Sequence, residues 1–245
     1  MTAPLPNWRR WLPLPWAFAL AVGWLLAGMR VVGILGPVQW RWLLPLGFVV
    51  MAVLPWLLMT APGRRSIGLR HATHWRFYAL ALGAGCAAAL VCGLLGLALF
   101  GIGADNWFMS IAINYRNTLD TRGLALWQLH LFFTLPACLF SPIGEEIFFR
   151  GLLHSALHER FGARAATVSE AGMFGLVHVC HHGLWLAAAG WALRPVSGPL
   201  WVLLMFGTAL VFSALRQRSG SLGPSIVAHA TFNATMNTFI FATLW

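Results

Sequence analysis

Two adjacent carboxylates, Glu145 and Glu146, lie in a long apolar stretch and are followed by Arg150. The chain has only six acidic residues, and a charge within an apolar stretch needs a partner or a function. On a helix Glu146 and Arg150 share a face, so they can form an ion pair that supports the structure. Glu145 points about 100° away from Glu146. A carboxylate among apolar neighbours suits a general base or acid, so we interpret Glu145 as the catalytic candidate.

Three further side chains with useful chemistry occur in two later apolar stretches. His178 lies in the first, whereas His229 and Asn233 lie in the second, four positions apart and therefore on one helix face. We expect His178 to share a water molecule with Glu145, and His229 and Asn233 to donate hydrogen bonds to a developing oxyanion. A carboxylate-activated water with an oxyanion hole is what amide hydrolysis requires. Nucleophilic proteolysis fits less well, because no Gly-x-Ser-x-Gly motif is present and the cysteines lack an obvious base.

The same polar residues also have other interpretations. Buried Glu, His and Arg mark ion pathways, so a membrane transporter or proton-relay protein is the main alternative, and a non-catalytic membrane scaffold is a third. A transporter is expected to show inverted repeats, and we find no second half that corresponds to the Glu145 region. We interpret His154 as part of a solvated helix end, and His181 and His182 as another wet helix end. Glu170 could pair with an arginine and is given no role.

The composition is that of an integral membrane protein. The chain has 245 residues, of which 59% are hydrophobic and 9% are charged, whereas soluble domains carry about 25% charged residues. The net charge of +10 comes from arginine alone, with no lysine. The arginines fall in short clusters between apolar spans, which favours contact with an anionic lipid surface and not with nucleic acid.

A helix needs roughly 20 apolar residues to cross a bilayer, and counting on that basis predicts about seven spans. They are expected at about residues 11–35, 40–60, 76–102, 123–158, 163–182, 200–215 and 221–245. The fold class is therefore an all-α, polytopic membrane helix bundle. We expect one integral membrane domain over residues 1–245, with a catalytic core at about 124–243. The first span resembles a signal peptide, but it continues without a clear cleavage site, so we expect it to be retained.

Several segments between or within the spans carry their own predictions. Residues 107–113 are expected to form a short interfacial helix, and the partly apolar piece 184–193 is expected to dip into the membrane. The fourth span is longer than one crossing, so we expect it to tilt, to break near Pro136 or Pro142, or to extend beyond the bilayer.

The arginine distribution predicts the orientation. With the N-terminus inside the cell, inside segments hold ten arginines and outside segments hold four, which favours a cytoplasmic N-terminus. The arginine-only, tryptophan-rich composition indicates a high-GC bacterial genome. We therefore expect a multi-pass protein of a bacterial inner membrane.

Three motifs, each in a separate apolar stretch, carry a resemblance to a known family. They are Glu145-Glu146-x-x-x-Arg150, Phe174-x-x-x-His178 and His229-x-x-x-Asn233. Together they resemble the signature of the CPBP family, the CAAX-processing and bacteriocin-processing (Abi) intramembrane endopeptidases. The resemblance covers about residues 135–240.

The resemblance implies an all-helical bundle whose site is reached from the cytosolic side. It implies that Glu145 and His178 activate water, that His229 and Asn233 hold the oxyanion, that Glu146 and Arg150 brace the site, and that Phe174 shapes the pocket. The expected substrate is a membrane-associated protein or peptide precursor. We expect no cofactor, although Glu145, His178 and His229 could form a three-ligand zinc site. A carboxylate can activate water without metal, and no His-Glu-x-x-His motif is present.

Overall fold

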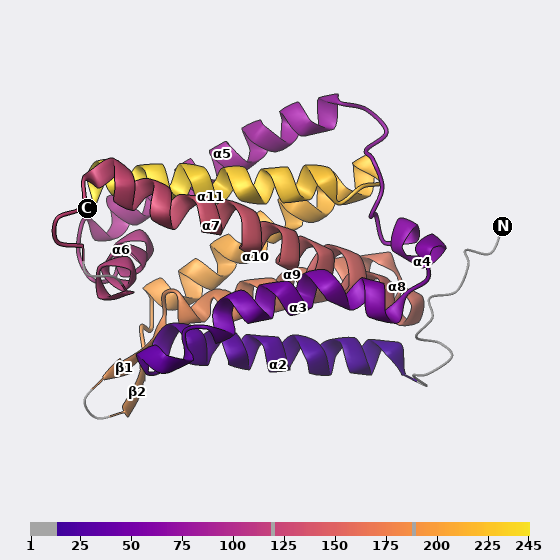
Figure 1. Cartoon of the computed structure of the whole chain (residues 1–245), viewed down its shortest axis with the longest axis horizontal. Coiled ribbons are helices and arrows are strands. Elements are labelled where there is room, and N and C mark those ends of the chain that lie inside the picture. Colours follow the sequence, from indigo (N-terminus) through magenta and orange to yellow (C-terminus); the bar gives the residue numbers. More distant parts are fainter. Residues whose placement is uncertain (1–13, 119–120, 188–189) are drawn as a thin grey trace.

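The computed structural model describes residues 14–118, 121–187 and 190–245, and it is almost entirely helical (Figure 1). Ten α-helices run along this part of the chain. In chain order they are α2 (Pro15–Leu35), α3 (Leu43–Leu58), α4 (Ala61–Ser66), α5 (Arg76–Phe100), α6 (Trp107–Thr118), α7 (Leu126–Glu145), α8 (His154–Phe161), α9 (Ala163–Val177), α10 (Ser197–Ser219) and α11 (Gly223–Thr243). Three shorter helical segments join them, namely η1 (Val38–Trp40), η2 (Glu146–Leu153) and η3 (His178–Cys180).

Five stretches of the described chain are long and apolar enough to cross a membrane. They are residues 15–35, 38–58, 76–100, 126–161 and 197–219. The multi-pass membrane class is therefore confirmed, whereas the count of seven is not. The segments predicted as the fifth and seventh spans form α9 and α11. α9 has only 15 residues, and the polar residues of α11, including His229, Asn233 and Asn237, reduce its mean hydropathy.

The expected boundaries agree with the helices to within a few residues for most spans. α2 begins at Pro15, with proline in its first turn, where a missing N–H costs nothing. The predicted opening residues 11–13 lie outside the described part of the chain. The helix expected at 107–113 is present as α6 and continues to Thr118.

The fourth span is continuous but changes its winding. The chain runs as one helical stretch from Leu126 to Phe161, and neither Pro136 nor Pro142 ends it. The change occurs after Glu145, where η2 adopts the wider π-helical hydrogen-bonding pattern over eight residues. Such widened turns interrupt α-helices mostly at functional sites.

The segment expected to dip into the membrane contains two paired β-strands, named the hairpin here, which the sequence did not predict. β1 (Leu184–Ala187) pairs antiparallel with β2 (Gly190–Leu193), and Leu184 lies opposite Leu193. The hairpin extends away from the helices at one end of the molecule (Figure 1). Hydrogen bonds between the two strands satisfy backbone polar groups of both, so these groups need no partners from the helix bundle.

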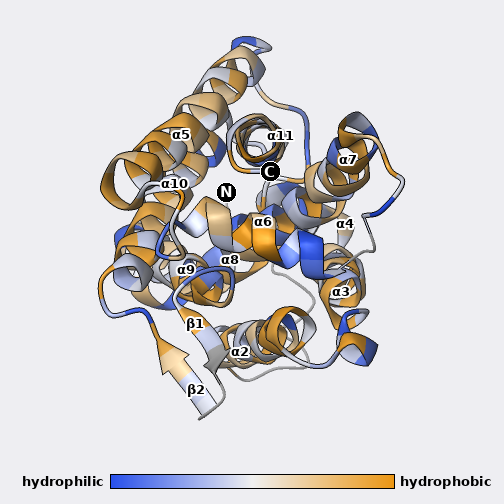
Figure 2. Cartoon of the chain, turned by 90° about the vertical axis from the view of Figure 1, so that its left-hand side faces the viewer, coloured by the Kyte–Doolittle hydropathy of each residue, from blue (hydrophilic) through white to orange (hydrophobic). Residues whose placement is uncertain are grey.

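The two ends of the bundle differ in their elements. One end carries α4 and α8, and the other carries α6, the hairpin and the C-terminus (Figure 1). We call these the α4 end and the α6 end. Figure 2 looks onto the α6 end, where α6 lies across the bundle between α2 and α3 on one side and α5, α7 and α11 on the other.

Close helix approach depends on small residues at two places. A Cβ at Gly85 of α5 would collide with the Ala228 carbonyl oxygen of α11, so glycine is required for this packing. A Cβ at Gly144 would lie 2.5 Å from the Phe48 carbonyl oxygen. Gly144 therefore brings the backbone of α3 against α7 one residue before Glu145.

Candidate active site

Glu145 and Glu146 stand at the junction of α7 and η2, and both side chains are fully buried. Because they are adjacent on a helix, they point in different directions and meet different partners. Each carboxylate has one engaged oxygen, Oε1, and one buried oxygen, Oε2, without a hydrogen-bond partner among the described residues.

Glu145 is paired with a cation from the first described helix. Its Oε1 lies 2.9 Å from Nη1 of Arg30 on α2 and accepts a hydrogen bond of 2.9 Å from the Ser141 hydroxyl. Arg30 also donates from Nε to Nε2 of His181 at 3.2 Å. Glu145 therefore has a cationic partner that the sequence analysis did not identify.

Glu146 contacts a histidine as well as the expected arginine. Its Oε1 lies 3.3 Å from Nη1 of Arg150, so the predicted i, i+4 ion pair is confirmed. The same oxygen is 2.9 Å from Nδ1 of His229 on α11. Sequence spacing indicated the first contact but could not indicate the second, which depends on how α11 packs against η2.

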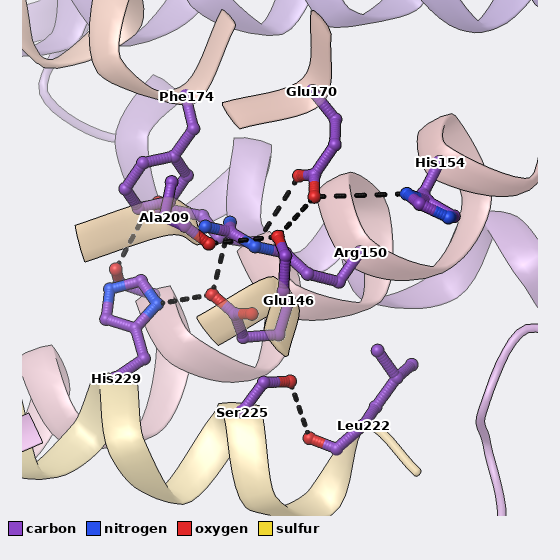
Figure 3. A network of polar contacts seen from close by, with 12 residues as sticks. Glu146, Arg150, His154, Glu170, Phe174, Ala209, Leu222, Ser225 and His229 are labelled. Atoms are coloured by element: carbon purple, nitrogen blue, oxygen red, sulfur yellow. Dashed lines mark hydrogen bonds and ion pairs between the residues drawn. The ribbon is translucent and has the colours of Figure 1, made fainter. Parts of the chain in front are cut away.

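Arg150 links Glu146 to a third buried carboxylate, Glu170 of α9 (Figure 3). The Arg150 Nε atom lies 3.5 Å from Glu170 Oε2, and the Ser213 hydroxyl donates a short hydrogen bond to Glu170 Oε1. His154 is buried, with its Nδ1 4.0 Å from the same carboxylate. His154 is therefore not part of a solvated helix end, and Glu170 has the arginine partner that spacing alone could not identify.

Aromatic rings enclose the Arg150 guanidinium. Its central carbon lies 4.2 Å from the centre of the Phe174 ring and 5.6 Å from that of Phe212, distances at which cation–π attraction operates. Phe174 also contacts the rings of His178 and His229, with centroid separations of 4.4 and 5.8 Å. Phe174 thus lies between the ion-pair network and the two histidines.

The hydrogen bonds of His178 and Asn233 leave part of each side chain available. Nδ1 of His178 is 2.6 Å from the Phe174 carbonyl oxygen. Because a carbonyl only accepts, Nδ1 carries the proton, and Nε2 of the neutral ring is an acceptor. Asn233 donates from Nδ2 to the Ala137 carbonyl oxygen at 2.8 Å, and an amide nitrogen has a second hydrogen to donate.

A cavity of about 520 Å³ brings most of the candidates together. His178, His229 and Asn233 all line it, and so do Phe174 and Arg30. Glu145 and Glu146 lie behind its wall. Glu145 reaches it through Ser141 and Arg30, which do line it, and Glu146 reaches it through His229. The expected convergence thus holds for three of the four residues, and the space is far larger than one water molecule.

His181 and His182, which sequence reasoning assigned to a wet helix end, have specific partners. His181 lines the cavity and accepts from Arg30. His182 lies in the turn before the hairpin, between the hydroxyls of Ser110 and Ser197 at 2.7 and 2.9 Å. Burial first, and then the Arg194 guanidinium, lower the pKa of His182 to about 4. A neutral His182 at pH 7 therefore bridges two helices.

A zinc ion is the alternative that the sequence leaves open at this site. Among the described residues, no group of three His, Cys, Asp or Glu side chains is arranged to hold one. Of the suggested zinc ligands, Glu145 is paired with Arg30. His178 and His229 use Nδ1 to contact the Phe174 carbonyl and Glu146, which leaves Nε2 of each ring without a partner in these contacts.

The fold and site define a multi-pass helical membrane protein with an internal cavity, three histidines and an asparagine at its wall, and carboxylates directly behind. The family model described as type II CAAX prenyl endopeptidase Rce1-like matches residues 127–235. Searches among curated proteins and among solved structures gave no match.

The matched region is the part of the chain that carries the three motifs, so the resemblance drawn from them is confirmed. The matched region contains all three motifs and every residue of the Glu146–Arg150–Glu170 network. It supports a protease and does not favour the transporter or proton-relay alternative. Arg30 lies outside it.

Proposed function

We propose that this chain is an intramembrane endopeptidase that hydrolyses a peptide bond of a membrane-associated protein or peptide precursor. The observation that carries the proposal is the shared cavity wall of His178, His229 and Asn233, next to two buried carboxylates within the matched family region. The proposed setting is a bacterial inner membrane, and the proposed chemistry is of the glutamic type, without metal.

Glu145 and His178 are proposed to activate the attacking water. Glu145 Oε1 is held by Ser141 and Arg30, so Oε2 is the oxygen that can take the proton. Nε2 of His178 can accept a hydrogen bond from the same water, because Nδ1 donates to a carbonyl. Two acceptors on one water would orient its lone pair toward a carbonyl carbon in the cavity. General-base help of this kind contributes about 10²–10⁴-fold.

Asn233 and His229 are proposed to stabilise the oxyanion. The second amide hydrogen of Asn233 is not used by Ala137. His229 is oriented by Glu146, which accepts from Nδ1, and its Nε2 donates to the oxyanion when the ring is protonated. The same ring can then pass a proton to the leaving amine. Glu146 acts through His229 and is a positioning residue in this scheme.

Arg30 is proposed as a second positioning residue. It fixes the orientation of Glu145 behind the cavity wall, since a buried carboxylate needs a charged or hydrogen-bonding partner. Its distance to Glu145, 2.9 Å, is shorter than either Arg150 contact. Removing Arg30 should therefore affect catalysis through Glu145 and leave the Arg150 network intact.

The test is comparative peptidomics of a strain that lacks the gene, complemented with the unchanged chain or with Glu145→Gln. We expect fragments that appear only with the unchanged chain. Glu159→Gln, at an exposed position on α8, is the matched control and should restore them. Fragments produced equally by Glu145→Gln would contradict the mechanism, and identical fragment sets in all strains would contradict the protease proposal itself.

A further inference from the structure

The two ends of the bundle differ in charge. Eight arginines lie at the α4 end of the described chain and four at the α6 end. Those at the α4 end are Arg64, Arg65, Arg70, Arg76, Arg160, Arg164, Arg216 and Arg218, and those at the α6 end are Arg41, Arg116, Arg122 and Arg194. Short loops rich in arginine stay on the cytoplasmic side. The distribution therefore assigns the α4 end to the cytoplasm.

The cavity extends toward the opposite end. Beyond the histidines its wall is formed by Asn114 and Thr118 of α6, Arg41 after η1, and Phe132 and Phe133 in the first half of α7. Thr118 is exposed, and Asn114 and Arg41 are half-buried, so the wall reaches the surface here. Among the described residues that line the cavity, none belongs to α4, to α8 or to the loops at the α4 end.

The α4 side of the cavity is closed by buried structure. His229, the lining residue of α11 closest to the α4 end, is six positions from Gly223, or about 9 Å along the helix. Behind it lie the Glu146–Arg150–Glu170 contacts and a cluster of fully buried side chains that includes Phe148, Leu152 and Ile67. A polypeptide coming from the α4 side would have to break these ion pairs, which are costly to open.

We propose that the substrate reaches the site from the non-cytoplasmic face of the membrane, through the opening beside α6. The substrate is then a polypeptide whose scissile bond lies in, or emerges from, the non-cytoplasmic half of the bilayer. This departs from the cytosolic access that the resemblance implies. The inference rests on the proposed function for the identity of the substrate, but the side of the opening can be tested without any activity.

The first test is the topology of the termini. The C-terminus lies at the α6 end (Figure 1), so alkaline phosphatase fused after Trp245 should be active in a bacterial host and a green fluorescent protein fusion should be dark. The reverse pattern would overturn the proposal. These fusions leave every residue of the chain unchanged, so they do not depend on a variant that folds.

The second test is the accessibility of single cysteines in intact cells. With the native cysteines replaced, Thr118→Cys at the cavity mouth should react with a membrane-impermeant maleimide. His74→Cys, exposed at the α4 end, should react only after permeabilisation. Labelling of His74→Cys alone in intact cells would overturn the proposal. The chain with Cys86, Cys92, Cys138 and Cys180 replaced and no cysteine added gives the background.

The third test asks whether the substrate passes through the opening to reach the site. Asn114 lines the cavity between the mouth and the histidines. Cleavage of a substrate found by peptidomics is measured for the Asn114→Cys variant before and after treatment with the impermeant reagent. We expect cleavage to fall at least tenfold in intact cells, with no change for labelled His74→Cys after permeabilisation. Unchanged cleavage by fully labelled Asn114→Cys would show that the substrate takes another route. The protease proposal would survive that result.

Discussion

The adjacent carboxylates Glu145 and Glu146 have partners from different parts of the chain. Glu146 belongs to a network whose members all lie within the matched family region, including His229, Arg150 and Glu170. Glu145 depends on Arg30, which lies on α2, outside that region. Glu146 is therefore held by residues of the matched region, whereas Glu145 is held by α2, a helix outside it.

This difference separates stability from chemistry. Removing Arg150 from the Glu146 network leaves buried carboxylates without their cation, so its main expected effect is on folding. Removing Arg30 takes away the partner that orients the proposed base Glu145, so its main expected effect is on catalysis. Four predictions follow that comparison from the largest effect to the smallest.

Glu145→Gln is expected to lower kcat by about 10²–10⁴-fold, because the amide cannot take a proton from water. The folded yield in detergent should stay near that of the unchanged chain, since glutamine can still accept from Ser141. Cleavage of a peptidomics-derived substrate measures the first effect, and gel filtration measures the second. A large loss of folded protein without loss of specific activity would place Glu145 in the structural network instead.

Arg150→Met is expected to destabilise the protein by about 3–5 kcal/mol, because Glu146 and Glu170 would remain buried without their cation. Denaturant unfolding in detergent micelles is the measurement. The matched control is Arg164→Met at an exposed site of α9, where little change is expected. If both variants unfold alike, the network does not carry the stability assigned to it.

Arg30→Met is expected to lower kcat by about ten- to hundredfold, which corresponds to about 1.5–3 kcal/mol for a contact between charged groups. KM should change little, because Arg30 acts through Glu145. Arg30→Lys should restore part of the activity by keeping the charge, which a merely structural role for the guanidinium would not predict. A change confined to KM would instead assign Arg30 to substrate binding.

Chelator treatment is expected to leave activity unchanged. The proposed acid–base groups are side chains of this chain, and the described residues offer no three-ligand metal group. Cleavage is measured before and after dialysis against a chelator, and again after zinc is added. Loss with chelator and recovery with zinc would replace the glutamic mechanism by a metal-dependent one.

The sequence was most informative where the interacting residues lie on one helix. The i, i+4 pair of Glu146 and Arg150 was predictable because both residues share a helical stretch. The membrane class followed from composition, and most helix limits followed from apolar stretches. The family was recognised from three short motifs, which the match over residues 127–235 confirms.

Contacts between distant helices could not be predicted. Arg30 was visible as an isolated charge in an apolar span, a signal that should have marked it as a site candidate. Its partner Glu145 lies 115 positions later, and no spacing rule connects them. The His229–Glu146 contact has the same origin. The count of seven spans is not confirmed, because α9 is short and because the polar residues of the membrane-length helix α11 lower its mean hydropathy.

The widened segment η2 has a consequence for changes in chain length. Over its eight residues the backbone hydrogen bonds skip one more position than in an α-helix, so η2 holds extra residues without lengthening the bundle in proportion. Deleting one residue there would favour ordinary α-helical winding and rotate everything on one side by about 100° relative to the other. Glu145 and Glu146 would then lose register with Arg150 and His154. At the positions of η2 outside the Glu146–Arg150 ion pair, substitutions are thus expected to be better tolerated than single-residue deletions.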